Sequence, residues 1–190
     1  GMDDQLNTIG QPIEGVEISI LSDSLREVPR LQRGLIAVRF KNEPIEVNYL
    51  GQDRSWKSGL RDGYFIPGDV GYISENGNLI YEGRTDDMMI FNGINIFPAE
   101  IERAMAGHEH VLEAAAFGIP SAVSGQVPCV ALVLKRDLSF DLLMQEFHAR
   151  LGSRAPRHIF KVPRLPRNPM GKVLRRELVR MARDVMSRKN

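Results

Sequence analysis

Apolar and polar residues alternate over short stretches of the first 85 residues. Residues 15–22 and 34–40 show the pattern of half-buried strands, because every second residue is apolar. Three further apolar runs predict short strands: 64–66, 70–73 and 78–81. The Asn76-Gly77 pair predicts a hairpin between the last two, because this pair tolerates positive φ. Residues 51–62 are polar and rich in glycine, which indicates a loop or a short helix. The first 85 residues are thus expected to be mostly β.

The pattern changes after residue 85. Two short strands are predicted on either side of Asn92-Gly93, and a helix is predicted to begin at Pro98. Four further elements follow: strands at 111–118 and 127–134, a helix after Ser139, and a short extended segment at 160–162. A last helix is predicted from near Val173. Alternating helices and strands indicate a small α+β domain, so the predicted fold class for the whole chain is α+β.

Two of these helices have one apolar side. The helix after Ser139 is expected to have an inward face of Leu142, Leu143, Phe147 and Leu151. The last helix has an apolar stripe of Leu174, Leu178, Met181 and Val185. Both sets follow the three-to-four-residue spacing of an amphipathic helix, so each predicts one side packed on a core.

Charge supports a division into two units. Residues 1–85 contain 9 basic and 13 acidic side chains, whereas residues 86–190 contain 16 basic and 11 acidic ones. The second unit therefore has a surface that suits an anionic ligand. The basic residues are spread out with few aromatics among them, so a nucleic-acid interface is disfavoured, although 7 basic residues and 2 acidic ones fall in 171–190.

Other classes are disfavoured by composition. The chain of 190 residues is 43% hydrophobic and 26% charged, which is typical of a folded soluble protein, and no apolar run approaches the length of a membrane span. Cys129 is the sole cysteine, so no internal disulfide forms. Its apolar neighbours predict a buried structural thiol. These features fit a cytoplasmic protein.

Asp69 and Arg84 are the first candidates for chemistry. Asp69 follows a Pro-Gly corner at a strand end, where it could satisfy nearby backbone donors or accept two hydroxyl groups from a ribose. Arg84 ends the neighbouring strand and could equally be a surface cation paired with Asp86 or Asp87. A metal site at Asp86-Asp87 is disfavoured, because no third carboxylate lies at a useful spacing. The sequence His108-Glu109-His110 lacks a second histidine at helical spacing, so a solvated loop is expected there.

Lys172 is the last candidate. It follows Gly171, but the pair does not match a phosphate-binding P-loop, because Pro166 and Val173 occupy the positions of the required glycine and hydroxyl residue. Lys172 could be one more solvated lysine. Its place on a turn stiffened by Pro166 and Pro169 instead favours a held ammonium group, which suits neutralisation of a phosphate.

Taken together, these spots resemble one family, the adenylate-forming enzymes: AMP-forming acyl-CoA synthetases, adenylation domains of peptide synthetases, and luciferases. Residues 63–105 (GYFIPGDVGYISENGNLIYEGRTDDMMIFNGINIFPAEIERAM) resemble that family's Trp/Tyr-Phe-x-Thr-Gly-Asp, Gly-Arg-x-x-Asp and Gly-x-x-Ile-x-Pro-x-Glu-Ile-Glu motifs, in that order. Residues 165–178 (LPRNPMGKVLRREL) resemble its C-terminal Leu-Pro-x-Thr-x-x-Gly-Lys-x-x-Arg-x-x-Leu motif. Each motif is moderately specific, and the ordered set is strongly so.

The resemblance implies a role for each matching residue. Asp69 would bind the ribose hydroxyls of ATP or AMP, with Arg84 as the second ribose contact. Asp86 would be the hinge of a mobile C-terminal domain. Gly93 would lie on the loop that lines the pantetheine tunnel. Lys172 would reach the α-phosphate and the attacking carboxylate during adenylation.

The resemblance also implies which parts of the enzyme are present. Residues 1–85 would be the tail of the large domain, from its β-barrel part, and residues 86–190 the complete mobile lid. Family members run to several hundred residues, so the phosphate loop, the acyl pocket and the Mg-binding glutamate would belong upstream. In this sequence Pro67 replaces the usual Thr or Ser, which removes a hydroxyl near the nucleotide.

The predicted function is therefore that of a C-terminal fragment of an acid–thiol ligase, inactive by itself. The implied substrates and cofactors are a carboxylic acid, ATP or AMP, Mg bound through the missing large domain, and either coenzyme A or a carrier-protein pantetheine. The resemblance thus implies a ligase, with a place in fatty acid metabolism. The alternative is a non-catalytic accessory or truncated protein that binds a large domain in trans or self-associates. Neither a nucleic acid nor a membrane is expected as a partner.

Overall fold

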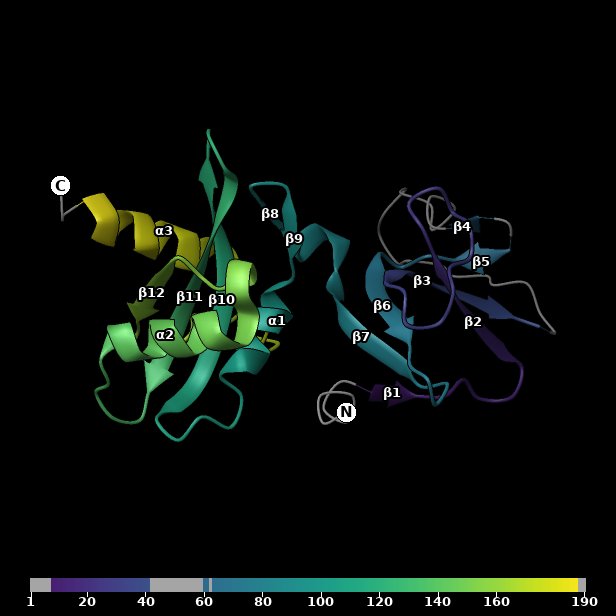
Figure 1. The fold of residues 1–190 in the computed structure, drawn as a ribbon, viewed down its shortest axis with the longest axis horizontal. Helices are drawn as coiled ribbons and strands as arrows, with labels where there is room; N and C mark the ends of the chain where they lie inside the picture. Colours follow the sequence, from purple (N-terminus) through teal and green to yellow (C-terminus); the bar gives the residue numbers. More distant parts are fainter. Residues whose placement is uncertain (1–7, 42–59, 62, 188–190) are drawn as a thin grey trace. The chain divides into compact units, whose positions relative to one another are not determined.

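A computed structural model describes residues 8–41, 60–61 and 63–187 of the chain. The chain divides into two compact units, Gly1–Asp86 and Asp87–Asn190, whereas the sequence placed the boundary after residue 85 (Figure 1). Most of the predicted loop or short helix at 51–62 lies outside the described residues.

The first unit is an antiparallel sheet. Its strands are β1 (Thr8–Gly10), β2 (Val16–Leu21), β3 (Gly34–Phe40), β4 (Leu60–Arg61), β5 (Tyr64–Phe65), β6 (Asp69–Ile73) and β7 (Leu79–Arg84). The order of pairing is β1-β7-β6-β3-β5-β4, and β2 pairs along the other edge of β3, from Leu35 to Phe40. Alternate residues of these strands point to opposite faces, so Ile20, Ile36 and Leu79 meet in one buried cluster. The predicted strands are confirmed, whereas β1 and β4 were missed because they are too short to show a pattern.

The hairpin predicted at Asn76-Gly77 is confirmed. It joins β6 to β7, and the amide of Ser74 donates to the carbonyl of Asn78 at 2.8 Å. Gly77 has φ +78°, a conformation that side chains rarely adopt, so glycine is required at this point. The tight turn fixes the register of the two strands and thereby sets Asp69 opposite Arg84 at the far end of the hairpin.

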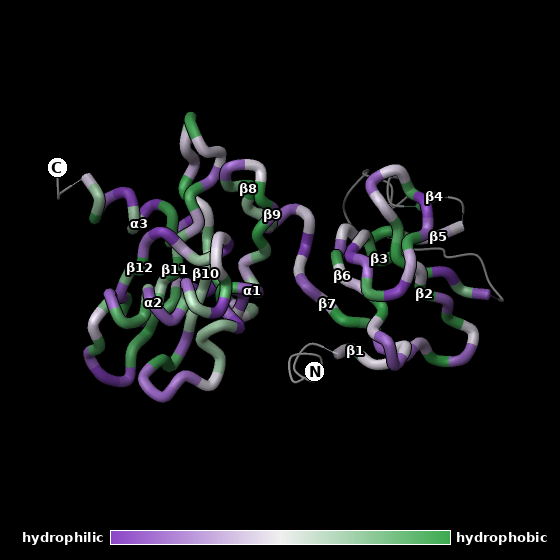
Figure 2. The backbone as a smooth tube through the Cα atoms, in the orientation of Figure 1, coloured by the Kyte–Doolittle hydropathy of each residue, from purple (hydrophilic) through white to green (hydrophobic). Residues whose placement is uncertain are grey.

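The second unit has a sheet with helices on both faces. Its elements are β8 (Met89–Phe91), β9 (Ile94–Ile96), α1 (Pro98–Ala104), β10 (Val111–Ser121), β11 (Gly125–Leu134), α2 (Phe140–Leu151), β12 (His158–Lys161) and α3 (Arg175–Ser187). The long strand β11 pairs antiparallel with β10 on one side and parallel with β12 on the other. Its hydrophobic colouring is continuous over much of its length (Figure 2). The fold class is therefore α+β, as predicted.

The two faces of this sheet bury separate cores. Ile101 of α1 and Phe147 of α2 belong to one buried cluster, whereas Leu178 and Ala182 of α3 belong to the other. Cys129 is fully buried in the second cluster, as predicted, and burial raises the pKa of its thiol to about 12. A strand that is covered on both faces is expected to be apolar throughout, as residues 127–133 are.

The predicted inward face of α2 is partly wrong, and the predicted apolar stripe of α3 is only partly buried. In α2, Leu143 and Phe147 are fully buried, but Leu142 is 52% exposed. In α3, which begins two residues later than expected, Leu178 is buried, whereas Met181 and Val185 are exposed by 37% and 45%. The buried residues of α3 are instead Leu178 and Ala182, four residues apart, which pack in the cluster on that face of the sheet.

Candidate functional site

Asp69 and Arg84 lie opposite each other at the ends of two paired strands. Asp69 is the first residue of β6 and Arg84 the last residue of β7. An oxygen (Oδ1) of the carboxylate lies 3.8 Å from the Nη1 atom of the guanidinium, and both side chains are partly exposed. The pair is therefore a loose ion pair whose polar atoms remain accessible, a geometry that leaves both groups able to contact hydroxyls of a bound ligand.

The corner before Asp69 is fixed by the neighbouring strand. Arg84 donates from Nη2 to the carbonyl of Pro67 at 2.9 Å, and the hydroxyl of Thr85 donates to the carbonyl of Gly68 at 3.1 Å. Gly68 has φ +86°, and a Cβ there would lie 3.2 Å from the Thr85 hydroxyl oxygen. These contacts define the position of the backbone next to Asp69. Thr85 was missed by sequence reasoning, although its place next to Arg84 could have suggested it.

Asp86 lies at the boundary between the two units. It belongs to a one-turn 3₁₀ helix, η3 (Thr85–Asp87), and its side chain is exposed. The first unit ends at Asp86 and the second begins at Asp87. A hinge requires a residue whose backbone can rotate without breaking packing, and an exposed residue at a boundary meets that requirement.

Gly93 lies in the tight turn between β8 and β9. Asn92 and Gly93 have φ of +49° and +77°, and the Asn92 amide donates to the carbonyl of Ser124 at 3.0 Å. Two consecutive positive φ values are typical of a type I′ hairpin turn. Nothing among the described residues lies within 4 Å of a Cβ built at Gly93, so the backbone conformation, and not crowding, favours glycine here.

Lys172 lies on an exposed turn that is organised by Asn168. The carboxamide oxygen of Asn168 accepts from the amides of Met170 at 3.0 Å and Lys172 at 2.9 Å. The Asn168 amide donates back to the Lys172 carbonyl at 2.9 Å. Asn168 therefore contributes to the stiffness of this turn, which the sequence predicted from the prolines alone. Asparagine commonly bonds to a backbone amide two residues on, and that tendency could have identified it.

The two ends of the turn are also joined. The backbone of Arg167 bridges to that of Val173, and the Leu174 amide donates to the Pro166 carbonyl at 2.8 Å. The guanidinium of Arg167 donates to the Gly171 carbonyl at 2.8 Å and pairs with Glu113 of β10. The Lys172 backbone is thus held on a closed loop while its side chain remains exposed.

Arg175 ties the first turn of α3 to the rest of the second unit. Its Nε atom donates to the carbonyl of Ala116 at 3.0 Å, and Nη2 donates to Glu102 of α1 at 3.0 Å. Its Nη1 atom lies 3.8 Å from a carboxylate oxygen of Asp87. Arg175 lies in the same motif as Lys172, and the structure joins that motif to the two motifs that contain Asp87 and Glu102.

The histidine pair is not the solvated loop that was expected. The side chain of His108 is only 9% exposed, and its Nε2 atom lies 3.3 Å from a carboxylate oxygen of Glu146. The packing of α2 beside this segment buries His108, which the local sequence could not show. Within the described ranges, no cluster of three metal-ligating side chains occurs.

The structure thus places the candidate residues in separate groups. Asp69 and Arg84 form one group in the first unit, and Asp86 ends that unit. Gly93 and Lys172 belong to the second unit and lie on different turns. In the described part of the chain, no helix is long and apolar enough to span a membrane.

Comparison with known proteins identifies the class. Residues 100–172 match the family model of the AMP-binding enzyme C-terminal domain. The 2-succinylbenzoate–CoA ligase of Geobacillus kaustophilus is 35% identical over 180 residues, which is 93% of this chain and 36% of that protein. The oxalate–CoA ligase of Saccharomyces cerevisiae is 32% identical over 89% of this chain and 32% of its own length.

Solved structures agree. The o-succinylbenzoate CoA synthetase of Bacillus subtilis, in complex with the acyl-adenylate intermediate, matches with a TM-score of 0.82 at 31% identity. The match covers 93% of this chain and 36% of that one. ATP-bound MatB from Rhodopseudomonas palustris matches with a TM-score of 0.82 at 29% identity, over 94% of this chain and 36% of its own.

The chain thus matches the C-terminal part of adenylate-forming enzymes over almost its whole length. The curated relatives named above are CoA ligases, and the chain spans about a third of their length, 36% in the case of the Geobacillus kaustophilus protein.

Proposed function

We propose that this chain supplies the ribose-binding corner and the mobile lid of an AMP-forming acid–thiol ligase. The observation that supports the proposal is the placement of Asp69 directly opposite Arg84, on a corner braced by hydrogen bonds to Pro67 and Gly68. A carboxylate accepts two hydroxyl hydrogens, and a guanidinium donates to hydroxyl or phosphate oxygens. The pair therefore suits the ribose of ATP or AMP.

Lys172 would act in the first half-reaction. A carboxylate attacks the α-phosphorus of ATP, so two anions approach each other and charge builds on the phosphate oxygens. The ammonium group of Lys172 would offset that charge. The closed turn around Asn168 holds the backbone, so less freedom is lost when the side chain engages the substrate.

Asp86 and Gly93 would act in the change to the second half-reaction. Rotation at Asp86 would move Lys172 away after the acyl-adenylate forms. The β8–β9 turn with Gly93 would then line the path of a pantetheine thiol, from coenzyme A or a carrier protein, toward the adenylate. One lid would thus serve two steps, an instance of domain closure that completes a site.

The 190-residue polypeptide would have no adenylating activity by itself, because it matches only about a third of the length of the relatives, 36% for one of them. The test is pyrophosphate release with ATP, Mg and a panel of carboxylic acids that includes 2-succinylbenzoate, oxalate and long-chain fatty acids. Robust turnover by the purified chain would contradict this part of the proposal.

Calorimetry tests the ribose corner directly. ATP and AMP are titrated into the chain and into the Asp69→Ala, Lys172→Ala and Glu75→Gln variants. We expect weak binding that is lost in Asp69→Ala and retained in Glu75→Gln, because Glu75 is exposed in the turn at the opposite end of the same hairpin. Equal binding by Asp69→Ala would contradict the assignment of the ribose site.

A second function is favoured by the exposed apolar residues of the first unit. Ile9, Ile13 and Leu31 are exposed by 65%, 76% and 55%. Such residues would suit an accessory protein that binds a large domain in trans or self-associates. Light scattering tests for self-association, because a monomeric molar mass at every concentration would argue against an apolar association surface.

A further inference from the structure

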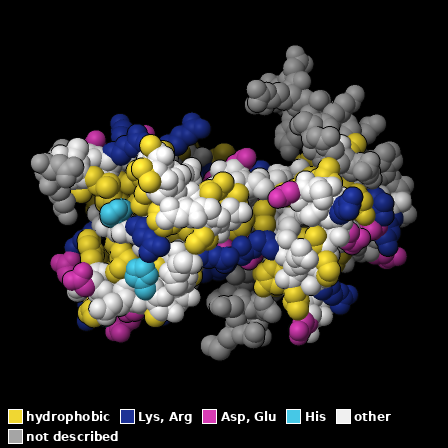
Figure 3. Space-filling model, turned by 45° about the horizontal axis from the view of Figure 1, so that its top comes forward, with side chains coloured by type: hydrophobic (Ala, Val, Ile, Leu, Met, Phe, Trp, Pro, Cys, Tyr) yellow, Lys and Arg dark blue, Asp and Glu magenta, His cyan; other side chains and the backbone are white. Residues whose placement is uncertain are grey.

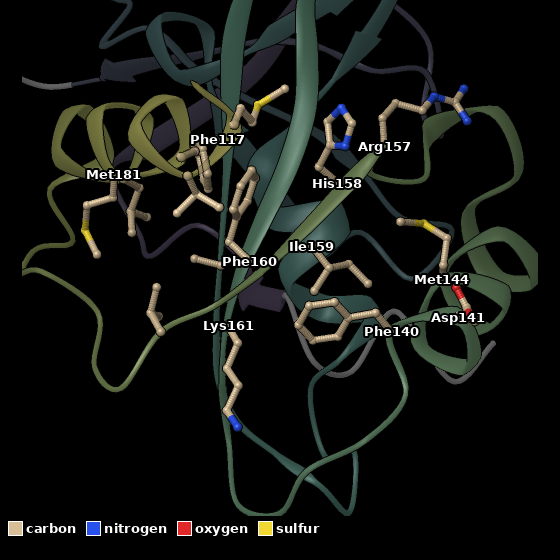
Figure 4. Close-up of a pocket in the computed structure, with 16 residues that line it drawn as sticks. Phe117, Phe140, Asp141, Met144, Arg157, His158, Ile159, Phe160, Lys161 and Met181 are labelled. Carbon is tan, nitrogen blue, oxygen red and sulfur yellow. The ribbon is translucent and has the colours of Figure 1, made fainter. Parts of the chain in front are cut away.

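An apolar groove of about 630 Å³ lies in the second unit between α2, α3 and β12 (Figure 4). Phe140 and Met144 of α2 line one side of it, and Met181, Val185 and Met186 of α3 line the other. None of the residues proposed to act on nucleotide or thiol lines this groove. It is therefore a feature that the proposed ligase chemistry leaves without a role.

The floor of the groove is an edge strand. Among the described residues, β12 pairs with β11 and with no other strand. The Val162 amide donates to the Leu132 carbonyl at 3.0 Å, and the backbone groups of a strand alternate in direction. Those of Ile159 and Lys161 therefore face away from β11, which leaves a ladder that a further strand could complete.

The side chains of β12 point alternately into the two flanks of the groove. Ile159 packs against the buried cluster on the side of α2, whereas Phe160 packs against the cluster on the side of α3. A strand added beside β12 would also point its side chains alternately toward the two helices. Both flanks are apolar, so consecutive residues of that strand would need to be apolar.

Basic side chains at the two ends of β12 favour acidic residues on both sides of such a segment. Arg157 and His158 lie at one end of β12 and Lys161 at the other, whereas Asp141 is the one acidic side chain in the lining (Figure 4). Lys161 pairs with Asp137, which is 86% exposed, so a carboxylate on a partner could take the place of Asp137. Hydrophobic side chains also lie at the surface beside Lys, Arg and His side chains (Figure 3).

We propose that this groove binds an extended segment of a partner protein by strand addition to β12. The segment has a run of about four apolar residues, matched to the length of His158–Lys161, with acidic residues on both sides. Main-chain hydrogen bonds to Ile159 and Lys161 supply affinity, and the apolar flanks select the side chains.

A designed peptide provides the test. It has about four Val and Ile residues between pairs of Glu residues, and it is titrated into the isotope-labelled chain by NMR. We expect amide shifts confined to β12 and methyl shifts at Met144, Met181 and Met186, with saturation at micromolar peptide. The absence of these shifts at millimolar peptide would overturn the proposal.

Matched peptides distinguish strand addition from general hydrophobic binding. N-methylation of the peptide at the residues that face β12 removes the ladder hydrogen bonds and is expected to abolish binding, whereas N-methylation at the alternate residues leaves binding in place. If the two N-methylation patterns weaken binding equally, the peptide does not bind by strand addition. A peptide with Lys pairs in place of Glu is expected to bind at least about tenfold more weakly, and equal affinity would overturn the acidic partner.

Protein variants locate the site. Met181→Glu places a charge in the groove and is expected to weaken binding at least about tenfold, whereas Val123→Glu, at a 97% exposed position on the β10–β11 turn, has no effect. Val185→Glu replaces Met181→Glu if that variant does not fold. Self-association of the free chain that Met181→Glu abolishes would overturn the proposal in favour of a second copy as the occupant.

Discussion

The two units of this chain are built with very different amounts of core. Among the described residues, the first unit has one buried cluster of three side chains, Ile20, Ile36 and Leu79. The second unit has two clusters, on opposite faces of its sheet, in which side chains from the helices and from the strands are buried. The second unit thus contains most of the apolar burial that stabilises a fold.

Two groups of polar contacts in the first unit centre on Glu17 and Glu82. The guanidinium of Arg39 lies 4.6 Å from the centre of the Tyr64 ring and donates to Glu17 at 2.7 Å, while Tyr64 donates to Glu17 at 3.1 Å. Arg33 pairs with the mostly buried Glu82 on β7. Ion pairs at partly exposed sites contribute little to stability, so the first unit is expected to be the less stable of the two.

Phe147→Ala should have the largest effect on this comparison. Phe147 is fully buried on the α1 and α2 face, so its removal is expected to lower the free energy of unfolding of the second unit by about 3–5 kcal/mol. Hydrogen exchange of β11 amides measures that loss, while amides of β3 report on the first unit. An equal increase of exchange in both units would show that they do not unfold separately.

Ile36→Ala should have the next largest effect, on the other unit. Ile36 is 5% exposed in a cluster of three, so we expect a loss of about 2–4 kcal/mol. Because the described part of the first unit has fewer buried apolar residues than the second, that loss is expected to unfold its sheet at a denaturant concentration at which β11 stays protected. Exchange of the β6 and β7 amides measures it. Full protection of these amides in the variant would contradict the small-core interpretation.

Asn168→Ala should have a smaller and local effect. It removes the acceptor for two backbone amides. We expect the free energy that stabilises the closed turn to fall by about 1–2 kcal/mol, with no change in the cores. Faster exchange of the Met170 and Lys172 amides measures it, and Asn168→Asp serves as the control because it keeps the acceptor oxygen. Unchanged exchange in Asn168→Ala would assign the stiffness of the turn to the prolines.

The smallest expected effect is the dependence of the stability of the first unit on pH. Hydrogen bonds from Arg39 and Tyr64 lower the pKa of Glu17 in the folded chain. A carboxyl group with a lowered folded pKa stabilises the fold above its unfolded pKa of roughly 4.3, and this contribution is lost as the pH falls through the folded value. NMR titration of the Glu17 carboxyl carbon in the chain and in Arg39→Gln measures it. Identical titration curves in the two would contradict the assigned cause.

Local patterns in the sequence predicted much of the structure, because strand alternation and turn preferences depend on neighbouring residues. The strand 34–40, the Asn76-Gly77 hairpin and the Asn92-Gly93 turn were predicted for this reason. The candidates Asp69, Arg84 and Lys172 were found from motifs, and their roles remain predictions. Leu142 and His108 were misjudged, since their burial depends on how α2 packs against elements distant in the chain.

What the sequence determined by itself was the order of the elements, the α+β class and the set of motif residues, since each depends on spacing along the chain. Only the tertiary structure decided which of those residues meet. Strand register placed Asp69 opposite Arg84, and Arg175 was joined to Asp87 and Glu102 across segments far apart in sequence. The sequence likewise did not show that β12 is an edge strand, because that depends on how many strands pair with it in the folded sheet.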